Sequence, residues 1–173
     1  AKVTRPSVCN SLDTALIDKE VAEELIPKIL EGFKESKVEV FADEISYAIF
    51  QKHGYSMLQK AKPEDFGKEW LDFKVSIKVL DGMEEALEHI EKHSSRHSEA
   101  IITSDRTLAE RFINEVDAAA VYHNASTRFT DGEEFGLGAE IGISTQKLHA
   151  RGPFALEKLV TEKWILRGNG QIR

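Results

Sequence analysis

The feature that most constrains this fold is a regular alternation of short apolar segments with longer amphipathic ones. The clearest apolar segment is 73–80, and Asp81 follows it as the predicted cap of a helix from about Met83 to His93. Segments 13–17 and 38–41 also read as strands, and helices are predicted at 19–34 and 43–51. Strands that alternate with helices of this length predict an α/β domain with three layers, a mainly parallel sheet flanked by helices.

The second half of the chain continues the pattern less clearly. We predict a buried strand at 100–103, a helix from Ser104-Asp105 to Asn114 and a strand at 117–122. A last helix is expected to open at Gly152-Pro153, with a terminal strand at 163–166, and 53–68 reads as a loop. In helix 19–34 the expected buried stripe consists of Val21, Leu25, Ile29 and Phe33.

Length and charge limit the classes of function. A chain of 173 residues predicts one domain, and its formal charge of −7 argues against binding to nucleic acid or to an anionic membrane. No apolar run approaches the roughly 20 residues that span a bilayer and there is no signal peptide, so we expect a cytoplasmic protein. The single cysteine excludes an internal disulfide and leaves a free thiol.

That cysteine, Cys9, lies at the junction between an irregular segment and a predicted strand. It follows Pro6, and Asn10-Ser11 comes directly after it. A thiol in this polar setting can be an exposed nucleophile, but free cysteines are also often buried and inert. From the residues alone, the two interpretations are about equally supported.

A long polar loop follows the predicted strand that ends at Tyr122. Parallel sheets bind ligands at the carboxyl ends of their strands, so Arg128 is our candidate to bind a phosphate or a carboxylate. Asn124, Ser126 and Thr127 could add neutral hydrogen bonds to the same ligand. Arg151 could help, although a salt bridge between elements explains it equally well.

Three further patterns carry less weight. Gly136–Gly142 has the spacing GxGxxxG after a polar turn, so we reject it as a dinucleotide fingerprint. His89, His93 and His97 are four residues apart, but a histidine-rich helix end explains them better than a metal site does, and we predict no metal. His123 and His149 flank the loop and remain weak candidates for proton transfer.

Four segments resemble one family. They are Thr4–Asn10 (TRPSVCN), Asn124–Gly132 (NASTRFTDG), Phe135–Thr145 (FGLGAEIGIST) and Leu148–Pro153 (LHARGP). The chain from about Lys2 to Arg173 resembles the gamma-glutamyl phosphate reductase family of the aldehyde dehydrogenase superfamily. The same motifs occur in the reductase half of bifunctional pyrroline-5-carboxylate synthases, so motifs alone do not separate the two.

The resemblance implies a reaction and roles for two residues. Cys9 matches the family's catalytic cysteine, which would take the acyl group of L-glutamyl 5-phosphate as a thioester, with its own backbone amide as one oxyanion donor. Reduction with NADPH would give L-glutamate 5-semialdehyde, in proline biosynthesis. Glu69 matches the superfamily glutamate that binds the nicotinamide ribose, although Leu71 replaces the usual aromatic residue two positions later.

The resemblance also affects the domain organisation. Residues 1–173 would form the catalytic domain with an aldehyde dehydrogenase-like fold, and the family's N-terminal NADP-binding domain is absent, so we expect the chain alone not to reduce a substrate. The alternative is a non-catalytic module that folds or self-associates. Family members form dimers or tetramers, and a homo-oligomer is therefore possible.

Overall fold

The core of the molecule is a four-stranded parallel sheet. The computed structural model describes residues 1–173, and the strands run β1 (Thr14–Asp18), β2 (Glu39–Ala42), β3 (Leu58–Lys60) and β4 (Lys74–Leu80). Their order across the sheet is β1-β4-β2-β3, and every pair is parallel. The predicted α/β class with a mainly parallel sheet is confirmed. β3 was missed, because it is three residues long and lies within the polar segment predicted as a loop.

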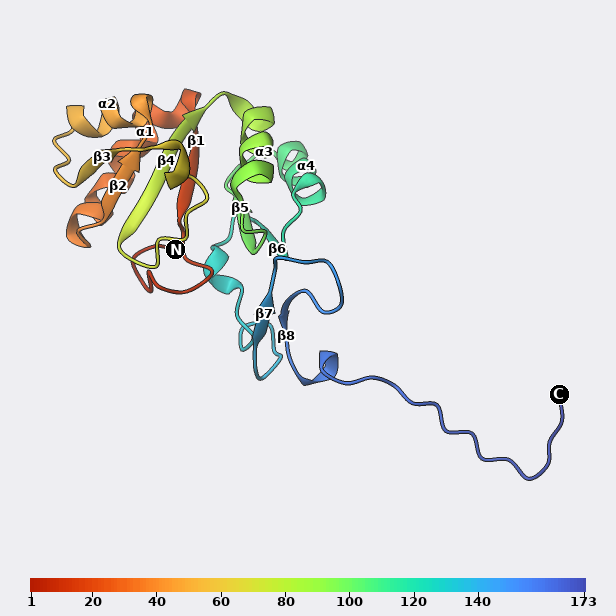
Figure 1. Ribbon diagram of the computed structural model, residues 1–173. Helices are drawn as coiled ribbons and strands as arrows, with labels where there is room; N and C mark the ends of the chain where they lie inside the picture. The colour runs from red at the N-terminus through yellow and green to blue at the C-terminus, as the bar shows by residue number, and fades with distance from the viewer.

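Two helices cover one face of this sheet (Figure 1). Helices α1 (Lys19–Glu35) and α2 (Glu44–Lys52) each begin at an aspartate whose carboxylate accepts a backbone hydrogen bond, Asp18 and Asp43. They bury an apolar cluster with Val40, Val75 and Ile77 of the sheet. The predicted stripe on α1 was partly wrong: Val21 and Leu25 are exposed, and the buried residues are Ala22, Ile26, Leu30 and Phe33. Four-residue spacing alone leaves the exact rotation of a helix open.

The other face of the sheet is covered by the segment 61–73. The ring of Trp70 stacks on Phe41, with centroids 4.2 Å apart, and its indole Nε1 donates to the hydroxyl of Ser76. Ser76 in turn donates to the carbonyl of Asp65. Because Phe41 and Ser76 are register partners on β2 and β4, this segment is fixed to the centre of the sheet.

A second, smaller unit follows along the chain. It contains α3 (Gly82–His93), β5 (Ser98–Ile101), α4 (Arg106–Glu115) and β6 (Ala120–His123), and β5 pairs parallel with β6. Asp81 precedes α3 but its side chain makes no capping bond; it pairs with Lys19 instead. The strand predicted at 100–103 lies two residues earlier and is only partly buried, and Ile102 is 78% exposed.

The last elements depart most from the sequence prediction. β7 (Ile141–Ile143) and β8 (Gly152–Phe154) form an antiparallel pair, and β8 lies where a helix was expected to open. Gly152 has φ +74 and packs against Ala119, and its strand pairs with β7 where the helix was expected. The strand predicted at 163–166 is also wrong: Trp164 and Leu166 are largely exposed, and the segment after Lys158 extends away from the body (Figure 1).

No helix is both long enough and apolar enough to cross a lipid bilayer.

Candidate functional site

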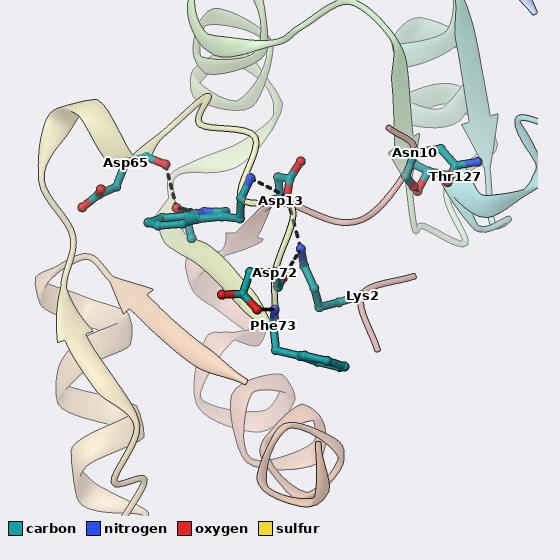
Figure 2. A network of polar contacts seen from close by, with 9 residues as sticks. Lys2, Asn10, Asp13, Asp65, Asp72, Phe73 and Thr127 are labelled. Atoms are coloured by element: carbon teal, nitrogen blue, oxygen red, sulfur yellow. Dashed lines mark hydrogen bonds and ion pairs between the residues drawn. The ribbon is translucent and has the colours of Figure 1, made fainter. Parts of the chain in front are cut away.

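Cys9 lies in an N-terminal loop that is closed by an ion pair at its base. The ammonium of Lys2 is buried and lies 3.1 Å from a carboxylate oxygen of Asp13, and it also donates to the carbonyl of Asp72 (Figure 2). The same Asp13 oxygen accepts from the backbone amide of Trp70. The loop that carries Cys9 is therefore joined to the edge of the sheet and to segment 61–73.

Asn10 joins the loop to a second part of the chain, more than a hundred residues away. Its side-chain Nδ2 donates to the carbonyl of Thr130 at 2.7 Å, and its own carbonyl accepts from the hydroxyl of Thr127 at 2.7 Å. The guanidinium of Arg128 donates to its side-chain Oδ1. Asn10 is 4% exposed, and Figure 2 shows it close to Thr127. The structure thus brings Cys9 and Arg128 to one place.

The surroundings of Cys9 do not favour its thiolate. The residue is exposed, yet protein packed around the thiol raises its pKa above the ordinary value, and the carboxylate of Glu140 raises it further. Glu69 also raises the pKa of Cys9, more weakly than Glu140 does, and the positive charge of Arg128 lowers it. Most of the thiol is therefore protonated near neutral pH.

Glu69 and Glu140 come from different segments but influence the same groups. Both lie close enough to Cys9 and to His97 to affect their pKa values, although burial is the main cause at each. Glu140 also accepts a hydrogen bond from the backbone amide of Gly132. The exposed carboxylate of Glu69 is thus near the thiol and is free to accept from hydroxyl groups of a ligand.

The three neutral residues predicted to bind substrate are engaged in contacts within the chain. Asn124 has φ +53, and its amide donates to and accepts from the backbone of Thr103. Ser126 accepts from the amide of Arg128 at the start of the short 3-10 helix Thr127–Phe129. With Thr127 bonded to the carbonyl of Asn10, these three side chains shape the loop, and Arg128 is the charged member of the set that contacts the Cys9 loop.

A buried hydroxyl, Thr130, holds this loop in place, and sequence reasoning missed it. Thr130 is 1% exposed, and its Oγ1 lies 2.6 Å from the hydroxyl of Ser98 and 2.7 Å from that of Tyr122. Ser98 also contacts Nδ1 of His97 at 2.8 Å. Nothing in the sequence separates Thr130 from the other polar residues nearby, because its role depends on partners that only the fold brings together.

The remaining predicted residues lie elsewhere. Arg151 forms a salt bridge with Asp117 at 2.8 Å, as the alternative to a role in ligand binding predicted. His89 and His93 pack against Phe66 and each other, and no group of three or more His, Cys, Asp or Glu is placed to hold a metal ion. His123 contacts the carbonyl of Thr103 through Nε2.

The glycine-rich segment borders an acidic hollow. The hollow has a volume of about 370 Å³ and its lining includes the carboxylates of Asp131, Glu133 and Glu140. Such a lining repels phosphate, which agrees with rejecting a phosphate loop here.

Comparison with known proteins gives consistent similarity over the whole chain. It is 55% identical over 174 residues to a gamma-glutamyl phosphate reductase of Chlorobaculum parvum, and 55% identical over 173 residues to that of Clostridium acetobutylicum. The match covers all of this chain but only 41% and 40% of those relatives, so the chain spans about two fifths of their length. No protein-family model matches the chain.

Solved structures agree with the fold. The crystal structure of gamma-glutamyl phosphate reductase from Thermotoga maritima superposes with a TM-score of 0.89 at 44% identity, over 99% of this chain and 40% of that one. The Saccharomyces cerevisiae enzyme gives 0.55 at 28% identity, over 73% and 32%. An acetylating aldehyde dehydrogenase from Geobacillus thermoglucosidasius shares the fold, at 0.53 and 17% identity over 74% and 36%. The chain therefore belongs to the gamma-glutamyl phosphate reductase family.

Proposed function

We propose that the chain is the cysteine-bearing catalytic part of an NADPH-dependent gamma-glutamyl phosphate reductase, which converts L-glutamyl 5-phosphate to L-glutamate 5-semialdehyde in proline biosynthesis. The similarity of this whole chain to about two fifths of reductases of that name supports the family's reaction. The observation that supports the residue assignment is the joining of the Cys9 loop to Arg128 through Asn10, because a thiol nucleophile and an anion-binding cation must act on the same substrate.

In this proposal Cys9 is the nucleophile. Its thiol loses a proton to solvent, and the sulfur attacks the acyl carbon. The bond between that carbon and the phosphate oxygen breaks, phosphate leaves with the electron pair, and a thioester remains on Cys9. Arg128 binds the phosphate as it departs, since a guanidinium donates two parallel hydrogen bonds to such an anion.

Because the pKa of Cys9 is raised, acyl transfer is expected to accelerate with pH until the thiol has ionised. The midpoint of that pH profile should lie above the pKa of an ordinary cysteine. Removal of Arg128 should move the midpoint to still higher pH, because its positive charge lowers the pKa of Cys9.

The cofactor is NADPH, and it supplies the hydride that reduces the thioester when it is bound. Glu69 fits a place beside it, because its exposed carboxylate lies near Cys9 and can accept from two ribose hydroxyls. The rest of the cofactor would be held by an N-terminal NADP-binding domain, so the 173-residue chain should acylate Cys9 without oxidising NADPH.

The test is to mix the chain with an activated 5-ester of L-glutamate and NADPH. Intact-mass measurement should show one glutamyl group on Cys9, while absorbance at the NADPH band stays constant. Cys9→Ser should remain unmodified. No adduct, or an adduct that persists in Cys9→Ser, would refute Cys9 as the nucleophile. Substrate-dependent NADPH oxidation would show that residues 1–173 bind the whole cofactor.

We also propose that the chain forms a homo-oligomer. Apolar side chains between 156 and 172 are largely exposed, including Trp164 at 85% and Leu166 at 88%, and such surface favours association. Light scattering of the chain and of Trp164→Ser with Leu166→Ser tests this, because the double variant should have the lower mass. Equal masses would contradict it.

A further inference from the structure

Two arginines of the second half have opposite electrostatic settings. Arg151 pairs with Asp117, which also binds Lys147, and these cations lower the pKa of that carboxyl to about 2. Arg128 takes part in none of the chain's ion pairs, and its partner is the neutral side-chain oxygen of Asn10. Arg151 thus has a carboxylate partner within the chain, which it shares with Arg96 and Lys147, whereas Arg128 has none.

The amide of Asn10 suits this purpose in a way that a carboxylate would not. Its Oδ1 accepts from Arg128 while its Nδ2 donates to the carbonyl of Thr130, so one planar group is fixed from both ends. An aspartate could accept from the arginine but would lose the second bond, and it would neutralise the guanidinium. A buried amide therefore holds Arg128 in place and leaves its positive charge available.

The charges around Cys9 explain why this matters. Glu140 and Glu69 are the anions that act on the thiol, and Arg128 is the cation that opposes them. An anionic acyl donor that approaches Cys9 is repelled by those two carboxylates. Its attraction to the site therefore depends on Arg128, an arginine that has no carboxylate partner.

We propose that Asn10 is a positioning residue that fixes Arg128 beside Cys9 with its charge uncompensated, and so selects anionic acyl donors over neutral ones. The inference rests on the proposed function for the identity of the donor, but the charge selection is a property of the site itself. It can be measured without any substrate.

The experiment compares alkylation of Cys9 by iodoacetate, which is anionic, and by iodoacetamide, which is neutral and similar in size. The quantity compared is the rate constant for iodoacetate divided by that for iodoacetamide, both measured at one pH. This ratio does not depend on the fraction of thiolate, because both reagents react with the same ionised sulfur. The chain is measured unmodified and as Asn10→Ser, Asn10→Asp and Arg128→Gln. Asn10→Ser is also made in the Arg128→Gln background, and Arg151→Gln is the matched control.

Arg128→Gln should lower the ratio roughly 3- to 10-fold, the effect of one charge several ångströms from the thiol. Asn10→Ser should lower it in the same direction, Asn10→Asp further, and Arg151→Gln not at all. In the Arg128→Gln background, Asn10→Ser should have no additional effect, because Asn10 acts through that arginine. If Asn10 had only a structural role, its substitution would change both rate constants by the same factor and leave the ratio unchanged.

Three results would overturn the proposal: an unchanged ratio in Arg128→Gln, an unchanged ratio in folded Asn10→Ser, or the same fall in Arg151→Gln. Thermal melts establish which variants fold. If neither Asn10 variant folds, protection of the unmodified chain decides: inorganic phosphate should slow alkylation of Cys9 by iodoacetamide, and Arg128→Gln should abolish that protection. Failure of glutamyl transfer with the expected ratios would count against the proposed function alone.

Discussion

Two regions of this chain are stabilised in different ways. The sheet region, residues 14–80, has an apolar core in which Val40, Val75 and Ile77 are fully buried beneath two helices. The loop region, residues 117–154, buries one apolar side chain, Phe154, and is held by polar contacts at Thr130, Asn10 and Asp117. The residues proposed to bind the anionic substrate belong to the second region, so its geometry depends on hydrogen bonds that single substitutions can remove.

The largest expected effect lies in the sheet region. Ile77→Ala removes a side chain with no exposure from the centre of β4 and should cost about 2–5 kcal/mol of unfolding free energy, through lost burial and a residual cavity. Denaturant melts measure it, and Ile102→Ala, at a residue 78% exposed, is the control with little effect. Equal losses at both positions would show that the core is not where the structure places it.

A smaller effect should appear with pH where α3 packs on the sheet region. Burial, assisted by His93, lowers the pKa of His89 from an ordinary 6.5 to about 4, so the folded chain keeps it neutral. Between pH 6.5 and 4 the unfolded chain binds the extra proton, and stability should therefore fall as pH decreases through that window, by up to about 3 kcal/mol. Above pH 6.5 the stabilisation is complete.

Melts at a series of pH values check this linkage. His89→Gln should flatten the slope between pH 6.5 and 4, and the exposed His53→Gln should leave it unchanged. An unaltered slope in His89→Gln would assign the pH dependence to other groups.

The smallest effect concerns the loop region alone. Thr130→Val keeps the shape of the side chain but leaves Ser98 and Tyr122 without their shared partner, at a cost of about 1–3 kcal/mol. Hydrogen exchange should become faster in 120–132 while β4 stays protected. Thr107→Val, at an exposed position, is the control. Uniform loss of protection would mean that the two regions unfold together and are not distinct.

The same contrast explains what the sequence could predict. Alternating apolar segments identified β1, β2, β4 and their helices, because burial in a parallel sheet leaves a strong pattern. β8 was predicted as the start of a helix and β7 was not predicted, since three-residue strands with exposed or glycine positions leave no such pattern. Cys9 and Arg128 could be proposed from residue type and resemblance, but Asn10 and Thr130 could not, because their partners are brought together only by the fold.

The central claim is that the loop region brings an available arginine to the nucleophile. The most direct measurement is the rate at which acetyl phosphate, a simple acyl phosphate, acetylates Cys9, compared with a neutral activated acetyl ester. Arg128→Ala should slow the reaction with acetyl phosphate by about 10–100-fold and hardly change that of the ester, as loss of a charge-assisted contact implies. Arg151→Ala should change neither. Equal rates for acetyl phosphate in the unmodified chain and Arg128→Ala, or an equal loss in Arg151→Ala, would contradict the account.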